Sequence, residues 1–235
     1  MPNAMVGDMP RRDLGIFTDT VLKLRDQVRT FDELDAFNKG RNPFPSGKPT
    51  GKARKVVEEW SELYDHLFGY KLDMSGIYVP AKVAGIERLI VEAEGITTQM
   101  AFDKAKELFP CWKCTDESLD KVVYNLYPRR GSIGYWARDR VEADEEYRNV
   151  CAEDMLMKKR ISGIGLRGRI LYEIKFFKET GKHLDINNGT ICSSSRYLDG
   201  YVPLVLWHSY GGKMYVSRIR PQDAYDSWRV REAVS

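Results

Sequence analysis

The sequence predicts an α+β fold, in which an N-terminal helical hairpin precedes a mixed helix and strand domain that ends in a β-hairpin. Helical periodicity dominates residues 1–75, and helix and strand patterns interleave from residue 76 onward. Near the C-terminus, two strand-like runs flank a Gly-Gly turn. Helices followed by interleaved strands and helices favour α+β over a doubly wound sheet. We therefore expect two domains, residues 1–75 and 76–235.

The N-terminal hairpin is predicted from two apolar stripes and the loop between them. Residues 13–29 carry apolar side chains three and four positions apart, which places them on one stripe of a helix; the stripe comprises Leu14, Phe17, Val21, Leu24, Val28 and Phe31. It either packs inside the fold or forms a dimer seam. The basic segment Asn38–Lys52 is a loop by its proline and glycine content. A second helix is expected over Lys52–Phe68, with Gly69 ending it.

Downstream of residue 76, the first half of the predicted domain alternates between strands and helices. Strands are expected at Arg88–Ala93 and Ser132–Arg138. Between them, Thr97 or Thr98 caps a helix that ends at Pro110. The acidic stretch Val141–Asn149 is predicted to be helical.

The second half begins with the clearest helix of the chain. Leu166–Thr180 places its apolar residues on one face, and Gly181 follows as a stop. A strand is expected at Gly189–Ser193. The closing hairpin comprises Val202–His208 and Lys213–Arg220, joined at Gly211-Gly212.

Composition excludes several classes of protein. The chain has 235 residues, of which 43% are hydrophobic, and a formal net charge of +3, so it can form a core and is neither disordered nor strongly basic. Its four cysteines are too few for a disulfide scaffold. The longest uncharged apolar run, Val202–Trp207, is too short to span a bilayer, and the first ten residues show no secretory signal. We expect a cytoplasmic protein with no membrane partner.

Several downstream segments carry a resemblance to a known family. Arg138–Glu146, Leu171–Asp185 and Thr190–Arg196 resemble recurring segments of an uncharacterised bacterial protein family, as do Phe109–Lys113 and Arg229–Ser235. The resemblance covers roughly residues 85–235 and implies that this region is one evolutionary unit. It implies no activity, ligand or catalytic residue.

Two glycine motifs resemble nucleotide-binding loops but lack their context. Gly163–Gly168 fits G-x-G-x-x-G, and Asp185 follows about where a ribose-binding acid would be found. A Rossmann site needs a buried strand before the first glycine, whereas Ala152–Arg160 is charged and helix-prone. We interpret the motif as a flexible helix entry. Gly47–Lys52 lacks the spacing and the hydroxyl of a phosphate loop, so no cofactor is expected.

Cys111-Trp-Lys-Cys114 is a single C-x-x-C. Zinc would need two further ligands, and the candidates are far away in the sequence and unclustered; they are Cys151, His183, Cys192 and His208. A redox site would place the pair at a helix start. The sequence favours structural thiols and no bound metal, with zinc and redox chemistry as alternatives.

A hydrolase is the main enzymatic alternative. Five carboxylates fall between Asp139 and Glu146, and on a helix Asp139, Glu142 and Glu146 would share a face. A nucleophilic site could combine His183, Asp185 and Cys192, although no positioned motif supports it. Acidic residues also favour the start of a helix, because its dipole is positive there.

The basic and aromatic residues favour a binding protein that is not an enzyme, with nucleic acid or an acidic protein surface as its partner. Arginines accompany aromatic residues in the C-terminal part, a combination that can hold phosphates and stack bases. The predicted binding residues are Arg196, Trp207, Tyr215, Arg218, Arg220 and Arg229, with Lys48 and Lys52 from the basic loop. A third hypothesis is a structural homo-oligomer joined through the N-terminal helices.

Overall fold

The structure is a computed structural model that describes residues 51–74, 77–128, 131–159 and 161–234, together with Val21 and Pro49. The chain divides into two compact units, Met1–Ser46 and Gly47–Ser235. The first helix of the predicted hairpin, the apolar stripe proposed as a dimer seam and Lys48 lie outside the described residues, apart from Val21. The account below concerns the larger unit.

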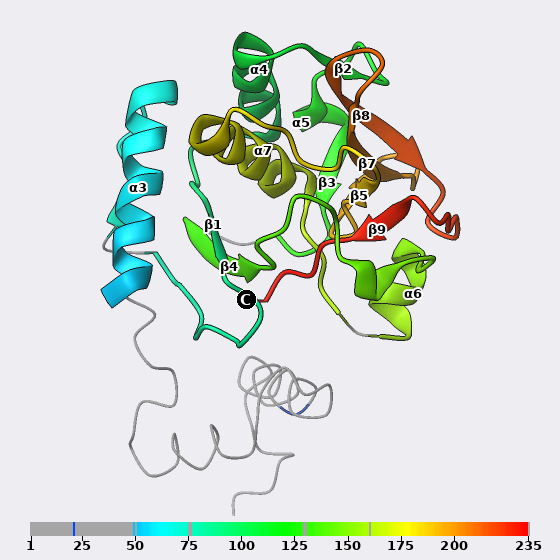
Figure 1. The fold of residues 1–235 in the computed structure, drawn as a ribbon, viewed down its shortest axis with the longest axis horizontal. Helices are drawn as coiled ribbons and strands as arrows, with labels where there is room; N and C mark the ends of the chain where they lie inside the picture. The colour runs from blue at the N-terminus through cyan, green and yellow to red at the C-terminus, as the bar shows by residue number, and fades with distance from the viewer. Residues whose placement is uncertain are drawn as a thin grey trace, which may run out of the picture. The chain divides into compact units, whose positions relative to one another are not determined.

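The α+β fold class is confirmed by helices and mixed sheets that interleave along the larger unit (Figure 1). Its helical elements are α3 (Gly51–Phe68), α4 (Thr98–Leu108), α5 (Leu119–Val122), η3 (Glu145–Tyr147), α6 (Ala152–Met157) and α7 (Leu166–Thr180). Within the described part of the chain, no helix combines the length and the apolar character that a bilayer crossing requires.

The largest sheet has five strands in the order β2-β8-β7-β5-β9. Its strands are β2 (Cys111–Lys113), β5 (Gly189–Ile191), β7 (Val202–His208), β8 (Lys213–Ile219) and β9 (Trp228–Val230). The predicted hairpin is confirmed as the antiparallel pair β7–β8. The sequence missed β2 and β9, which pair parallel with β8 and β5, so a strand follows the hairpin.

Among the described residues, the remaining strands form two antiparallel pairs. One joins β1 (Arg88–Glu92) to β4 (Ile133–Ala137), both of which the sequence predicts. The other joins β3 (Val123–Asn125) to β6 (Ser195–Tyr197).

Helix α3 packs against β1, on the outside of the β1–β4 pair (Figure 1). The indole Nε1 of Trp60 donates to the carbonyl of Leu89 at 3.1 Å, and the hydroxyl of Tyr64 donates to that of Val91 at 2.6 Å. Gly69 ends the helix as predicted, with a positive φ of 61°. From the sequence, this helix was expected in a separate N-terminal hairpin domain of residues 1–75. In the structure it packs against β1, which belongs to the residues that follow.

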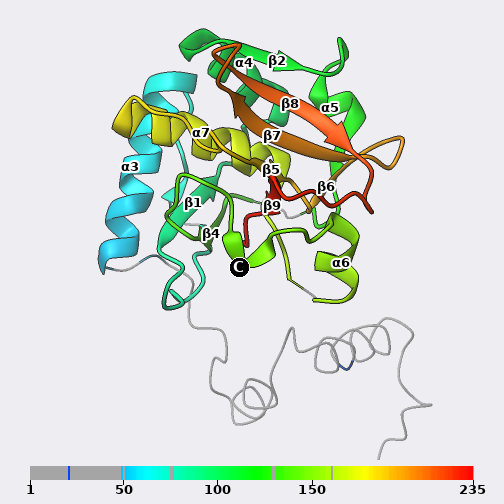
Figure 2. The same cartoon turned by 45° about the vertical axis from the view of Figure 1, so that its right-hand side comes forward.

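Helix α7 lies between the β1–β4 pair and the five-stranded sheet (Figures 1 and 2). It has the predicted bounds, and Gly181 ends it in the left-handed region at φ 67°. We call the sheet face toward α7 the inner face; Met214 and Val216 of β8 are buried in the core there. The opposite, outer face is covered at one end by a second core cluster, which joins Met155 of α6 to Leu204 and Ile219 of the hairpin.

The predicted helix over Val141–Asn149 is wrong. The segment is irregular and contains only the short 3-10 helix η3. Its backbone is held by tertiary contacts, because the amide of Ala143 donates to the side chain of Asn188 and the amide of Asp144 donates to the carbonyl of Val230. These partners are distant in sequence and replace the local hydrogen bonds that a helix would need.

Candidate functional site

A buried ionic cluster joins α7 to β5 and to the C-terminal segment. It consists of Arg169, Glu173, Asp185, Thr190 and Arg231, each at most 1% exposed. Arg169 donates to Glu173 at 2.8 Å and to Asp185 at 2.9 Å, and Arg231 donates to the other Asp185 oxygen at 2.7 Å. Two guanidinium groups thus face two carboxylates. This balance is what allows four ionisable groups to remain buried.

Asp185 is a structural anion in this cluster. Burial raises the pKa of its carboxyl group, but the charges of Arg231 and Arg169, helped by the hydroxyl of Thr190, outweigh burial and hold the pKa below its ordinary value. The carboxylate therefore stays ionised at neutral pH, with both oxygens occupied.

His183 is oriented by Glu173, which the sequence analysis did not single out. Its Nδ1 lies 2.9 Å from a Glu173 oxygen, and its ring stacks on Trp207 with centroids 3.3 Å apart and planes inclined by 5°. Phe177 stacks on the imidazole as well. Trp207, which the sequence predicted to be a binding residue, therefore packs against His183 on the inner face of the sheet.

The residues of the hydrolase alternative have separate partners. Asp185 is bound by arginines, whereas His183 pairs with Glu173. The thiol of Cys192 is buried and points to the carbonyl of Thr190, and burial raises its pKa to about 12. The raised pKa keeps the Cys192 thiol protonated at neutral pH, and a protonated thiol is a poor nucleophile.

The carboxylates between Asp139 and Glu146 do not share a helix face, because the segment is not a helix. Glu142 accepts from the backbone amides of Asn187 and Asn188. The other carboxylates pair with different arginines; the pairs are Asp139–Arg88, Asp144–Arg138, Glu145–Arg148 and Arg229, and Glu146–Arg140. The acidic cluster is thus dispersed over ion pairs that hold the loop.

Both cysteines of the C-x-x-C motif are free thiols at the edge of the sheet. Cys111 lies opposite Met214 in the β2–β8 register, and the Cys114 sulfur is 3.5 Å from the Tyr197 hydroxyl. Burial, followed by the charge of Glu173, raises the pKa of Cys111 to about 12. Among the residues that the structure describes, no group of three or more His, Cys, Asp or Glu side chains could hold a metal ion.

We expect Cys111 and Cys192 to resist alkylation in the native protein. A pKa raised from 9.0 to about 12 leaves each thiol with roughly a thousandfold less thiolate at pH 8. Iodoacetamide labelling followed by mass spectrometry, with and without urea, measures this protection. Rapid native labelling of Cys111 would favour the redox interpretation.

Close packing explains two glycines of the Gly163–Gly168 motif. A Cβ on Gly163 would lie 2.1 Å from the Ser193 hydroxyl, and one on Gly168 would lie 1.8 Å from the Tyr135 hydroxyl. The segment before α7 bonds to the C-terminal segment, because the amide of Ile164 donates to the carbonyl of Arg231. The motif is therefore a tightly packed helix entry and not the flexible one that the sequence suggested.

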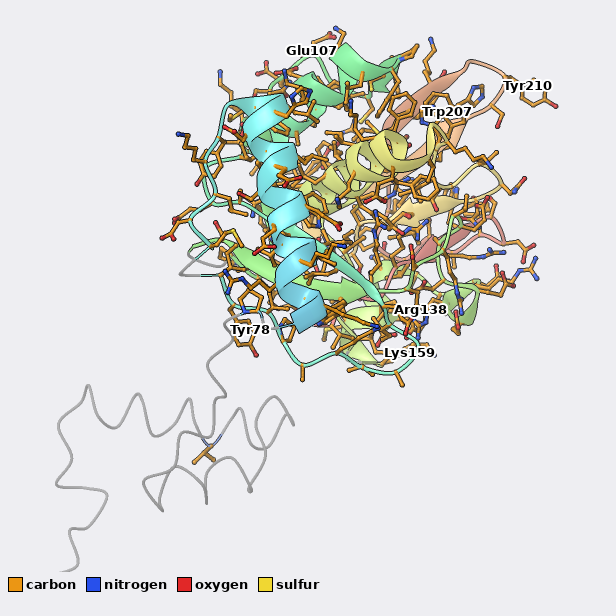
Figure 3. All side chains as sticks on the ribbon, turned by 60° about the vertical axis from the view of Figure 1, so that its left-hand side comes forward. Tyr78, Glu107, Arg138, Lys159, Trp207 and Tyr210 are labelled. Carbon is orange, nitrogen blue, oxygen red and sulfur yellow. The ribbon has the colours of Figure 1, made fainter. Side chains whose placement is uncertain are left out.

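An aromatic row crosses the outer face of the sheet where the second core cluster leaves it uncovered. The row consists of Trp112, Tyr215 and His208, with Tyr210 at the β7–β8 turn. Ring centroids are 5.0 Å apart between Trp112 and Tyr215 and 4.8 Å apart between Tyr215 and His208. Trp112 is 45% exposed, and Tyr210 is fully exposed and projects away from the molecule (Figure 3). We call these four side chains the outer aromatic row.

The strands beneath this row carry only positive charge. Strands β2, β7 and β8 contain Lys113, Lys213 and Arg218 but no aspartate or glutamate. Of these three cations, Lys213 lies opposite His208 on the face of the outer aromatic row, whereas Lys113 and Arg218 share the inner face with Val216. Of this row, only Tyr215 was predicted from the sequence to be a binding residue, and His208 was named there only as a candidate zinc ligand. The alternation of Leu204, Leu206 and His208 along β7 was a usable signal for the same face.

Two of the predicted binding arginines are largely buried. Arg229 pairs with Glu145 at 2.7 Å, with its side chain 13% exposed. Arg196 is 9% exposed and donates to the carbonyls of Ser193 and Ser195, each at 2.8 Å.

The remaining predicted residues are exposed and do not form one patch. Arg218 pairs with Asp199 and lies over the Tyr201 ring, and the side chain of Arg220 lies near the hydroxyl of the same tyrosine. Lys52 lies in the first turn of α3. The structure thus brings Arg218 and Arg220 together and separates them from Lys52.

Comparison with known proteins supplies no relative from which a role could be transferred. A scan against protein-family models found no family that matches the chain, and searches of curated proteins and of solved structures found no match either.

Proposed function

We propose that this protein binds single-stranded nucleic acid on the outer aromatic row. The observation that carries the proposal is a solvent-accessible row of rings with Lys213 beside it, on strands that contain no acidic residue. Bases stack on aromatic side chains whatever their sequence, because every base has a π face. Trp112, at the sheet edge, and Tyr210, at the turn, have the most accessible rings.

The same surface suits an anionic chain. Lys213 lies opposite His208 and supplies a cation beside the row, whereas Arg218 alternates to the other face of β8, with Met214 and Val216. An acidic protein surface would meet the same lysine but has no planar bases for the rings, which is why we favour nucleic acid.

Removing either accessible ring is expected to weaken binding. Stacking contributes about 1–3 kcal/mol per base, so Trp112→Ala and Tyr210→Ala should each reduce affinity roughly 5- to 150-fold. Neither side chain is buried, so the fold should persist. Fluorescence anisotropy with labelled single-stranded oligonucleotides measures the affinity, and wild-type affinity should fall with salt at a log–log slope of about −0.7 per phosphate contact.

The matched control is Tyr78→Ala, which removes an aromatic side chain that is 46% exposed but lies outside the row. It should leave affinity unchanged. Absence of binding by the wild-type protein at micromolar concentration and low salt would overturn the proposal. An equal loss in the control would exclude a specific role for the row.

A further inference from the structure

Arg196 differs from the other buried arginines in its charge pairing. Most described arginines with restricted exposure have a carboxylate oxygen within 3.0 Å; they are Arg88, Arg138, Arg167, Arg169, Arg229 and Arg231. Arg196 is only 9% exposed, yet no described carboxylate lies within 4.0 Å of its guanidinium. A largely buried charge without a counter-ion is costly unless a ligand supplies one.

The guanidinium is already oriented. Its Nη1 donates to the carbonyls of Ser193 and Ser195, which fixes the plane of the group from one side. Its Nε and Nη2 make no hydrogen bond to any residue that the structure describes. Neither atom is among the buried polar atoms that lack a hydrogen-bond partner, so both can be reached from solvent. These two N–H groups form one edge of the planar fork, the geometry that holds two oxygens of an oxyanion.

Two exposed tyrosines lie near Arg196. Arg196 lies opposite Tyr124 in the β3–β6 register, so both side chains are on the same face. Tyr124 is 46% exposed and Tyr127 is 50% exposed. Burial lowers the pKa of Arg196, while the nearby hydroxyls of Tyr124 and Tyr127 and the charge of Glu153 act in the opposite direction.

We propose that Arg196 is a binding site for a phosphate group, held by its Nε and Nη2 with Tyr124 and Tyr127 as further donors. A carboxylate has two oxygens, which the fork alone would satisfy. A tetrahedral phosphate offers further oxygens that suit the two phenol groups. The site involves none of the outer aromatic row and does not rest on the proposed function.

Glu153 opposes binding at this site. It is exposed in the first turn of α6 and near enough for its charge to act on Arg196, but it forms no ion pair with it. A phosphate at Arg196 would be repelled by this carboxylate. Neutralising Glu153 should therefore strengthen phosphate binding, a result that a purely structural role of Arg196 does not predict.

The test uses the full chain and inorganic phosphate, measured by isothermal titration and by the phosphate-induced rise in unfolding temperature at constant ionic strength. Arg196→Lys keeps the charge but loses the fork, and should weaken binding about tenfold or more. Glu153→Gln should strengthen it several-fold. Arg54→Lys, which changes an exposed guanidinium on α3, should have no effect.

Arg196→Lys could unfold the protein, because Nη1 holds two backbone carbonyls. The double variant Tyr124→Phe/Tyr127→Phe removes only hydroxyl groups and should weaken phosphate binding in a folded chain. Comparing inorganic phosphate with 5′-phosphorylated and unphosphorylated oligonucleotides, all in Trp112→Ala, identifies the source of the phosphate. Tighter binding of the phosphorylated end indicates a nucleic-acid terminus, and equal binding indicates the free ion.

Two results would overturn the proposal. One is a wild-type protein that shows no response to millimolar phosphate. The other is a response that persists unchanged in both the folded Arg196→Lys variant and the double tyrosine variant.

Discussion

Asp185→Asn is expected to lower the free energy of unfolding by about 3–5 kcal/mol, because it removes a charge that faces two buried arginines. Asp185 bonds to both Arg169 and Arg231 and is fully buried. Asparagine has nearly the same shape and tolerates the positive φ of 55° at this position. The loss therefore reports on charge and not on backbone strain. Urea unfolding followed by circular dichroism measures it.

The matched control is Asp199→Asn, which breaks the exposed ion pair with Arg218. An exposed pair contributes about 0–1 kcal/mol, so this variant should unfold close to the wild-type midpoint. Equal losses in the two variants would show that the buried cluster does not depend on its charge balance.

The pH dependence of this effect follows from the pKa of Asp185, which is lowered in the folded protein. A lowered pKa means that the stabilisation is fully present above the unfolded value, about 3.9, and is lost as pH falls toward the folded value. The difference between wild type and Asp185→Asn should thus be constant near neutral pH and shrink only in acid, below about pH 4. A difference that disappears between pH 5 and 7 would contradict the assignment.

Gly168→Ala is expected to destabilise the protein by about 1–3 kcal/mol through overpacking. On an exposed helix the same change would stabilise by about 1 kcal/mol. In α7, however, the new Cβ would lie 1.8 Å from the Tyr135 hydroxyl and 2.4 Å from a Glu92 oxygen. The sign of the change therefore tests the packing directly, by urea unfolding.

Tyr135→Phe provides the corresponding rescue. It removes the hydroxyl that the new Cβ would meet, so the double variant should recover part of the loss, with a coupling of about 0.5–3 kcal/mol. Tyr135→Phe alone should cost about 1 kcal/mol, because it removes the hydrogen bond to Glu92. Additive losses would mean that Gly168 is not required for packing against Tyr135.

The sequence alone was sufficient for the elements that local patterns encode. Leu166–Thr180 forms a helix with the predicted bounds, because its apolar side chains share a face and Gly181 can adopt a positive φ. The β7–β8 hairpin and the α3 helix were predicted for similar reasons. In each case the signal lies within a few residues of the element that it specifies.

The candidate sites depended on contacts that no local pattern records. Trp207 and Tyr215 occur on the same hairpin, but strand alternation sends one to the inner stack and the other to the outer aromatic row. Which face of the sheet is covered depends on where α7 packs, and no local sequence pattern specifies that. The arginines are alike in the sequence, yet Arg229 meets a carboxylate and Arg196 does not.

The physical reason is the range of the forces involved. Hydrophobic periodicity and capping act over one or two turns of chain, so the sequence by itself determined α3, α4, α7, the hairpin and the α+β class. Ion pairs and ring contacts form between residues as far apart as Arg138 and Glu232, which are separated by 94 positions. Only the tertiary structure decided which charges are neutralised, which rings remain accessible, and therefore where a ligand can bind.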